Sequence, residues 1–298
     1  MGLGPAAVKM NLELWKRGFF KNMKSVVEMG AQGLHLTLTD FEELLQMAGL
    51  TDYKKEKFCA LAEYPNGAGC SSRNFYEILG INEYACLDLD KVYGAIPLDL
   101  NRPLEDKALY GKYDLVTDYG TNEHIFNTPE AFRTMHRLCK PGGILMIGQV
   151  VYRGNGYYTY DPSFFEGMAA ANNYKILFSS YVVATTTPTA SGSSNQFHLP
   201  LSRELLDALD WTKTAELGIF YAMQKQAEAE FKTPYQTSDF SKFRLNHGYE
   251  LQLVQGPPSL SCIPVHTLNA IPGSVPGKAL LDELYYRAVK IIPFKRCK

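Results

Sequence analysis

Short apolar runs alternate with amphipathic stretches over most of the first 225 residues of the chain. The apolar runs predict buried strands, and apolar positions three and four residues apart between them predict helices. This alternation favours βαβ units and an α/β fold with a mostly parallel sheet. The predicted strands are residues 25–29, 84–88, 95–98, 113–117, 144–151, 175–178 and 217–222, and the predicted helices are residues 41–47, 75–79, 129–139, 164–172 and 278–291.

Capping residues and glycines predict where these helices begin and end. The helix over 41–47 is expected to start at Thr39 or Asp40, which can accept hydrogen bonds from free amides, and to stop at Gly49. Ser71 or Ser72 is the expected cap of the next helix. The run Lys140-Pro141-Gly142-Gly143 predicts a turn, because proline stops the preceding helix and the glycines allow the reversal.

Glycines and acidic residues follow the predicted strands, at the edge where open parallel sheets bind ligands. The first strand is followed by Gly30-Ala31-Gln32-Gly33, whose glycines let backbone amides approach a ligand closely. The second strand ends in Asp88-Leu89-Asp90, and an acid there can accept hydrogen bonds from both hydroxyls of a ribose. The third and fourth strands end in Asp99-Leu100-Asn101 and Asp118-Tyr119-Gly120-Thr121.

In this order the motifs resemble those of class I S-adenosylmethionine-dependent methyltransferases. The most specific part comprises Tyr113-Asp114-Leu115-Val116, Glu123-His124-Ile125 and the run from Leu138 to Leu145, similar to that superfamily's fourth strand, following helix and fifth strand. The resemblance implies a Rossmann-like, mostly parallel seven-stranded sheet with helices on both faces. It covers residues 20–225, so we expect a cofactor-binding domain over 1–225, with an inserted helical segment at about 35–80, and a C-terminal extension over 226–298.

The resemblance also implies the cofactor, S-adenosyl-L-methionine, and its contacts. Its amino-acid end would be held by Glu28, Gly30, Ala31, Gln32 and Gly33. Asp88 would bind its ribose, with Leu89 against the adenine, and Asp99 would bind the adenine amine, with Leu100 beside the ring. The cofactor and substrate would be lined by Asp118, Tyr119 and Gly120.

Two departures from the family pattern leave a rival for the glycine loop. Only Gly30 and Gly33 remain of GxGxG, and the distance from them to Asp88 exceeds the usual spacing of about 20 residues. The loop over 63–69 has the better spacing, but it follows a lysine-rich stretch and contains proline. We prefer the first loop because residues 25–29 form a credible buried strand, and we expect the loop over 67–74 to return toward the site.

His124 follows the fourth strand and is the candidate general base, with a structural role as the alternative. His136 lies in the middle of a predicted helix and is expected to be packed in the core. A metal site from Asp118, Glu123 and His124 lacks a specific ligand spacing, so no metal is predicted. The glycines and tyrosines of residues 153–161 suit either a loop that closes over an organic substrate or an ordinary surface loop.

The charges nearly balance, with 30 Lys and Arg against 31 Asp and Glu, so no basic field favours nucleic acid or anionic lipid. The longest apolar run, residues 142–152, is too short to span a bilayer. Six cysteines without CxxC spacing suit a reduced compartment. We therefore expect a soluble, cytoplasmic protein that binds a small molecule; a homo-oligomer is compatible with the sequence.

These observations together predict transfer of a methyl group from S-adenosyl-L-methionine to a small-molecule acceptor. O-methylation is favoured because a base candidate is present, and a hydroxyl nucleophile needs a base whereas a free amine does not. The alternatives are N-methylation of a small molecule and a non-catalytic S-adenosyl-ligand-binding protein. A nicotinamide-dependent oxidoreductase is disfavoured because GxGxxG is missing.

Overall fold

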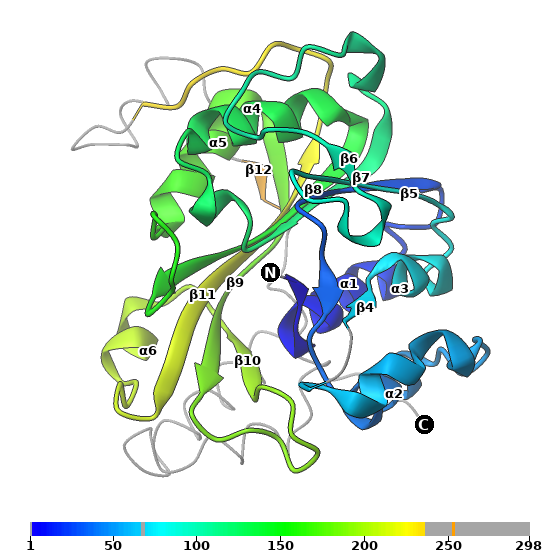
Figure 1. Cartoon of the computed structure of the whole chain (residues 1–298). Coiled ribbons are helices and arrows are strands. Elements are labelled where there is room, and N and C mark those ends of the chain that lie inside the picture. The colour runs from blue at the N-terminus through cyan, green and yellow to red at the C-terminus, as the bar shows by residue number, and fades with distance from the viewer. Residues whose placement is uncertain (1, 67–68, 236–251, 254–298) are drawn as a thin grey trace.

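The computed structural model describes residues 2–66, 69–235 and 252–253 (Figure 1). The helices are α1 (Pro5–Lys16), α2 (Leu38–Ala48), α3 (Arg73–Ile78), α4 (Thr128–Leu138), α5 (Pro162–Asn172) and α6 (Arg203–Asp207). The strands are β1 (Gly2–Leu3), β2 (Ser25–Met29), β3 (Gly33–Leu34), β4 (Cys70–Ser71), β5 (Glu83–Asp88), β6 (Ile96–Pro97), β7 (Tyr113–Tyr119), β8 (Cys139–Tyr152), β9 (Tyr174–Thr185), β10 (Gln196–Leu199), β11 (Thr214–Lys225) and β12 (Gln252–Leu253). Short 3₁₀ helices span Lys55–Glu63, Val92–Gly94, Lys107–Leu109 and Asn122–His124.

The main sheet has the strand order β10-β9-β11-β8-β7-β2-β5-β6, with β12 beside β9. Strands β6, β5, β2, β7 and β8 pair in parallel, and β11 runs antiparallel between β8 and β9. The seven predicted strands are all present, so the mostly parallel α/β sheet is confirmed, but β10 and β12 make it nine-stranded rather than seven-stranded. The chain builds outward from β2 to β6 and then restarts on the other side at β7. The carboxyl ends of β2 and β7 therefore flank the point where the strand order reverses, which is where such sheets form a ligand crevice.

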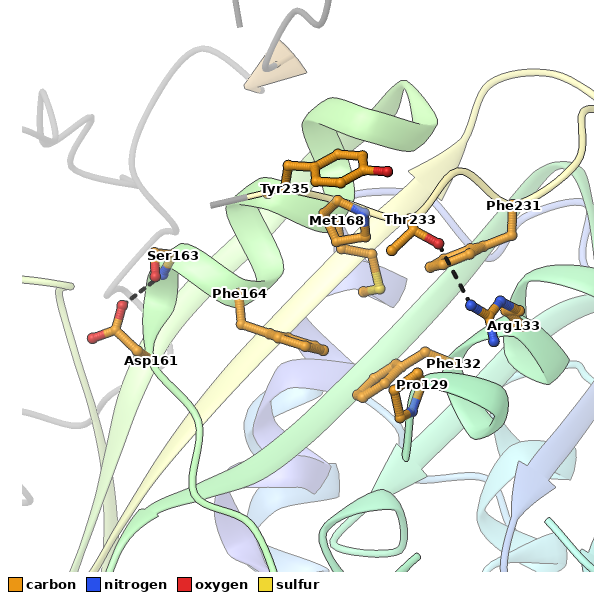
Figure 2. Close-up of a pocket in the computed structure, with 12 residues that line it drawn as sticks. Pro129, Phe132, Arg133, Asp161, Ser163, Phe164, Met168, Phe231, Thr233 and Tyr235 are labelled. Atoms are coloured by element: carbon orange, nitrogen blue, oxygen red, sulfur yellow. Dashed lines mark hydrogen bonds between the residues drawn. The ribbon is translucent and has the colours of Figure 1, made fainter. Parts of the chain in front are cut away.

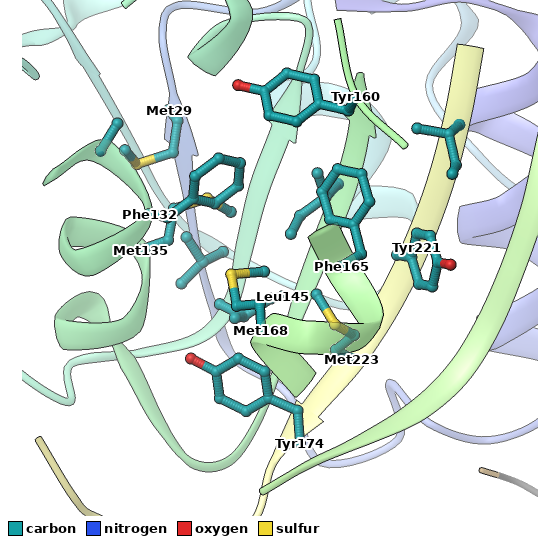
Figure 3. Close-up of a cluster of buried hydrophobic side chains, with 14 of the residues drawn as sticks. Met29, Phe132, Met135, Leu145, Tyr160, Phe165, Met168, Tyr174, Tyr221 and Met223 are labelled. Atoms are coloured by element: carbon teal, nitrogen blue, oxygen red, sulfur yellow. The ribbon is translucent and has the colours of Figure 1, made fainter. Parts of the chain in front are cut away.

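Helices cover both faces of the sheet, as predicted: α4 and α5 lie on one side and α1, α2 and α3 on the other (Figure 1). Alternate residues of the central strands enter the two cores, so Val116 and Leu145 face one side while Leu115 and Ile144 face the other. Figure 3 shows Phe132, Phe165 and Met168 packed in the first core.

Helix α1 is absent from the sequence-based prediction, and its burial explains why. Residues 5–14 are all buried, including Lys9, Asn11 and Glu13, so the polar positions in this helix do not mark a solvent-exposed face. Its start is marked only by Pro5 in the first turn, which lacks the amide that a helix start leaves unpaired.

The start of α2 is two residues earlier than predicted. Thr37, rather than Thr39 or Asp40, is the N-cap: its hydroxyl accepts a hydrogen bond from the Asp40 amide and donates one to the Asp40 carboxylate. Gly49 ends the helix with φ of 81°, as predicted. Ser72 precedes α3, but its hydroxyl makes no cap and instead donates to Glu28.

The predicted turn over Lys140–Gly143 is wrong, because β8 begins at Cys139 directly after α4. Cys139 pairs with Tyr113, and the register shifts before Leu115 pairs with Ile144. Residues 140–143 are therefore extra residues within the strand, at an irregularity in its pairing with β7. The Lys140 ammonium forms an ion pair with the Asp114 carboxylate at 3.0 Å.

His136 is buried as predicted. The Tyr174 hydroxyl donates to Nδ1 and Nε2 donates to the Ala229 carbonyl, each at 2.6 Å. The predicted helix over 278–291 lies outside the described residues, as does most of the expected extension. No helix among residues 2–66, 69–235 and 252–253 is both long and apolar enough to cross a membrane.

The two glycines of the 140–143 segment should differ in their tolerance of alanine. A Cβ at Gly142 meets nothing within 4 Å, so only its φ of 79° opposes the change, at about 1–2 kcal/mol. A Cβ at Gly143 would lie 2.9 Å from the Asp114 and Lys140 carbonyl oxygens, so Gly143→Ala should lose about 1–3 kcal/mol through the backbone shift it forces. Urea unfolding at neutral pH checks the order. A Gly142→Ala protein less stable than Gly143→Ala would show that backbone conformation, rather than space, dominates here.

Candidate functional site

The reversal point of the sheet is closed by contact between Gly30, after β2, and Thr121, after β7. Gly30 has φ of 76°, and a Cβ on it would lie 2.5 Å from the Thr121 hydroxyl oxygen. That hydroxyl donates a hydrogen bond to the Met29 carbonyl, to which the Gln32 side-chain amide also donates at 2.9 Å. Only glycine permits this approach, so Gly30 joins the glycine loop to the turn after β7.

Asp88 joins β5 to the same loop. Its Oδ2 accepts a hydrogen bond from the Ala31 amide at 2.8 Å, and its Oδ1 accepts one from the Asp90 amide at 3.2 Å. Asp90 itself is exposed. A carboxylate has about four lone-pair positions, so each oxygen of Asp88 keeps one for a further donor.

Glu28 is fully buried beneath the loop, where it links β2 to three other segments. Its carboxylate accepts hydrogen bonds from the Ser72 hydroxyl, from the Tyr84 hydroxyl at 2.6 Å and from the Gln32 amide at 3.2 Å. Burial raises the pKa of Glu28 to about 7, against the opposing effect of these hydrogen bonds. Glu28 therefore holds the shape of the loop.

The loop amides already have partners within the chain. The Gly30 amide donates to the Leu87 carbonyl, the Ala31 amide to Asp88 and the Gln32 amide to Glu28. These three amides are therefore already paired within the chain. What the loop offers to a ligand is acceptor oxygens.

Asp118 organises the turn after β7. It is fully buried and accepts hydrogen bonds from the Thr121 amide, the Asn122 amide and the Gln149 side-chain amide, the last at 2.7 Å. Burial raises the pKa of Asp118 to about 7, and the nearby Glu123 charge adds to the rise. Gln149 escaped the sequence-based prediction because it lies inside the apolar run of β8.

Three buried side-chain oxygens around this point have no hydrogen-bond donor within the described residues: Gln32 Oε1, Asn122 Oδ1 and Gln149 Oε1. Gln32 bonds to Met29 and Gln149 bonds to Asp118, whereas the Asn122 side-chain amide donates to Met135 Sδ in the core. Unpaired buried acceptors of this kind are costly.

Four more of the predicted residues lie in the two cores or directly after β5 and β6. Leu100 and Tyr119 are packed in the two cores, and the Tyr119 hydroxyl accepts a hydrogen bond from Asn11 of α1 at 2.8 Å. Leu89 is 69 % exposed after β5. Asp99 accepts from the Asn101 amide at 3.0 Å and pairs with Arg102, and these donors lower its pKa.

The other two predicted residues lie in backbone interactions close to the crevice. Gly33 pairs in β3 with β1 and β4. Gly120, with φ of 81°, donates its amide to the Gly148 carbonyl.

His124 lies at the end of the 3₁₀ helix over 122–124, with 35 % of its side chain exposed. Its Nε2 is 3.6 Å from Oε1 of the buried Glu123, and burial lowers the pKa of His124. No group of three His, Cys, Asp or Glu side chains in the described part of the chain could hold a metal ion.

A cavity of about 250 Å³ adjoins the loop and brings the two rival glycine segments together. Ala31 and Gly33 line one side of it, and Tyr64 and Gly69 line another. The segment over 63–69 follows a 3₁₀ helix and no strand of the main sheet, so the loop after β2 is the one at the crevice.

Tyr93 also lines this cavity and was missed from the sequence. A Cβ at Gly33 or at Gly69 would lie 3.1 or 2.3 Å from its hydroxyl oxygen, so the two glycines leave room for the ring.

A second cavity, of about 370 Å³, lies between α4, α5 and residues 231–235 (Figure 2). Phe132, Phe164 and Phe231 surround it, and none of the predicted cofactor residues lines it.

No family model and no curated protein matches the chain. Similar solved structures include 1,6-didemethyltoxoflavin-N1-methyltransferase of Burkholderia thailandensis with bound S-adenosylhomocysteine, at 10 % identity over 74 % of this chain and 79 % of that chain, with a TM-score of 0.39. A SAM-dependent methyltransferase of Archaeoglobus fulgidus matches at 11 % identity over 74 % of this chain and 94 % of that chain, also with a TM-score of 0.39.

The mostly parallel, Rossmann-like α/β sheet expected from the sequence is confirmed by the strand order β6-β5-β2-β7-β8-β11-β9.

Glu28 should make stability depend on pH. Because its pKa is raised from 4.5 to about 7, the folded chain keeps a proton that the unfolded chain loses between these values. Stability should therefore fall by about 1.4 kcal/mol per pH unit on this account as pH rises through that window. Glu28→Gln should remove this contribution to the slope of unfolding free energy against pH. Glu105→Gln, a change at an exposed position, should leave the slope as in the wild type. Urea unfolding across the window measures the slopes, and equal slopes in all three proteins would show that Glu28 is ionised in the folded state.

Proposed function

We propose that the chain transfers a methyl group from S-adenosyl-L-methionine to a small-molecule acceptor, with a hydroxyl group preferred over an amine. The observation that carries this proposal is the contact between the loop after β2 and the turn after β7 where the strand order reverses, with the Asp88 carboxylate joined to the same loop. S-adenosylmethionine carries an ammonium group, a positively charged sulfonium and two ribose hydroxyls. These groups are hydrogen-bond donors or cations, which complement a carboxylate such as that of Asp88.

The residues present fit this cofactor at Asp88. Asp88 has a free lone-pair position on each oxygen, which matches the two ribose hydroxyls.

The remaining cofactor contacts are proposed by position. The amino-acid end would lie along Glu28, Gly30, Ala31, Gln32 and Gly33, the adenine between the exposed Leu89 and the Asp99–Leu100 turn, and the reacting end beside Asp118, Tyr119 and Gly120.

When bound, S-adenosylmethionine supplies an electrophilic methyl group, and its sulfur keeps the electron pair of the broken bond. His124 is the proposed general base, which takes the proton of the acceptor hydroxyl as the oxygen gains the methyl group. Its lowered pKa keeps it neutral near pH 7, as a base must be, and its partial exposure gives an acceptor access to it. Glu123, anchored to the Val150 amide at 2.9 Å, fixes the backbone on which His124 lies.

Calorimetric titration with S-adenosylmethionine, S-adenosylhomocysteine and NAD tests the cofactor and Asp88 together. Both S-adenosyl compounds should bind and NAD should not. Asp88→Ala should weaken their binding by about tenfold to several hundredfold, because hydrogen bonds to a charged group are lost, and the exposed Asp90→Ala should cost much less. Binding of NAD alone would refute the methyltransferase assignment. Unchanged affinity in a folded Asp88→Ala protein would remove Asp88 from the ribose site.

His124→Ala should lower turnover about a hundredfold or more and leave the affinity for S-adenosylhomocysteine nearly unchanged. Protonation disables a base, so the wild-type rate should fall as pH drops through the pKa of His124, and the variant should lose this acid limb. The measurement is release of S-adenosylhomocysteine with an acceptor found from a panel of phenols and alcohols. Equal losses of turnover and of cofactor affinity would make His124 structural.

A further inference from the structure

Phe126 and Tyr157 are the two most exposed large hydrophobic side chains within the described residues, at 73 % and 71 %. Their rings contact each other edge to face, with centroids 5.9 Å apart and planes at 89°. Two large aromatic rings that meet each other yet remain open to solvent need an explanation, because such side chains usually contribute their area to a core or to an interface.

The backbones that carry these rings are held firmly. The Tyr157 amide donates to the Glu123 carbonyl at 2.7 Å, and the Tyr158 hydroxyl donates to the Phe126 carbonyl at 2.7 Å. Gly156 packs so closely that a Cβ on it would lie 2.7 Å from the Glu123 carbonyl oxygen. The pair is therefore exposed but ordered, unlike two side chains on a loose loop.

The pair stands at the carboxyl edge of the parallel strands. Phe126 follows β7 and Tyr157 follows β8, which are parallel neighbours, and ligands of such sheets bind at this edge. Phe126 is five residues from Thr121, which touches the glycine loop, so it lies within about 18 Å of the loop contact. His124 lies between Thr121 and Phe126 in the sequence.

Polar residues border the pair and limit what it can bind. Asn127, Arg153 and Asn155 are exposed on either side of it in sequence. A protein partner usually needs a contiguous apolar patch of several hundred Å², whereas two isolated rings match the area of one small molecule.

We propose that Phe126 and Tyr157 form the acceptor platform, and that the acceptor is a planar aromatic molecule that carries a hydroxyl group. A third ring can stack on, or meet edge-on, the exposed faces of the pair, as aromatic rings prefer. Its hydroxyl would then point toward His124. This inference rests on the proposed function, for which it names the class of substrate.

The test compares 2-naphthol with cyclohexanol, which has a hydroxyl but no aromatic ring. Saturation-transfer NMR titrations are run with the wild type and with a Phe126→Ala/Tyr157→Ala double variant, with and without S-adenosylhomocysteine. Met47→Ala, an exposed hydrophobic position on α2, is the control. 2-Naphthol should bind the wild type and the control alike and lose at least tenfold in affinity in the double variant, whereas cyclohexanol should bind weakly to all three.

The affinity for S-adenosylhomocysteine should be unchanged in the double variant, which also shows that the fold is intact. Equal binding of 2-naphthol to wild type and double variant, equal binding of cyclohexanol and 2-naphthol, or binding of neither would each overturn the platform. A protein that binds 2-naphthol as expected but no S-adenosyl compound would instead refute the proposed function alone. Loss of a dimer in the double variant, with 2-naphthol binding unchanged, would assign the pair to a contact between copies of the chain.

Discussion

The Met29 carbonyl oxygen receives hydrogen bonds from both Gln32 and Thr121 at the point where the strand order reverses. This shared acceptor draws the loop after β2 against the turn after β7, and Gly30 makes the approach sterically possible. Asp88 then ties the same loop to β5. Three strand ends that are far apart in sequence thus converge on a few atoms, and the position of His124 and of the aromatic pair follows from that convergence.

The same convergence determines which polar groups are paired here. The Gly30, Ala31 and Gln32 amides donate to Leu87, Asp88 and Glu28, so these three amides are not free to bind an anionic group. The raised pKa values of Glu28 and Asp118 have the same origin, since burial without a cationic partner disfavours their charged forms. A ligand with positive charge near Asp118 would favour the carboxylate again, so binding of such a ligand and release of a proton would be linked.

The central strands β2, β7 and β8 were predictable because they are mostly buried on both faces and contain long apolar runs. The same property hid Gln149, a polar residue within such a run, and the burial of α1 hid a whole helix. Asp88 could be placed near the glycine loop from the order of motifs, although its bond to the Ala31 amide depends on the register between β2 and β5. The turn predicted at Lys140–Gly143 failed because a shift in pairing with β7 is a tertiary event that local residue types do not encode.

Strand β11 lies between β8 and β9, both of which precede it in the chain, so Leu145 pairs with Met223 across a long stretch of sequence. During synthesis on the ribosome, strands β6, β5, β2, β7 and β8 can pair before β11 has been made. One edge of β8 is then unpaired. Pairings of such high contact order form slowly, and an apolar strand edge left open in the meantime invites association with other chains. The order of the strands that creates the crevice thus also leaves the nascent chain open to aggregation until residues 214–225 have been made.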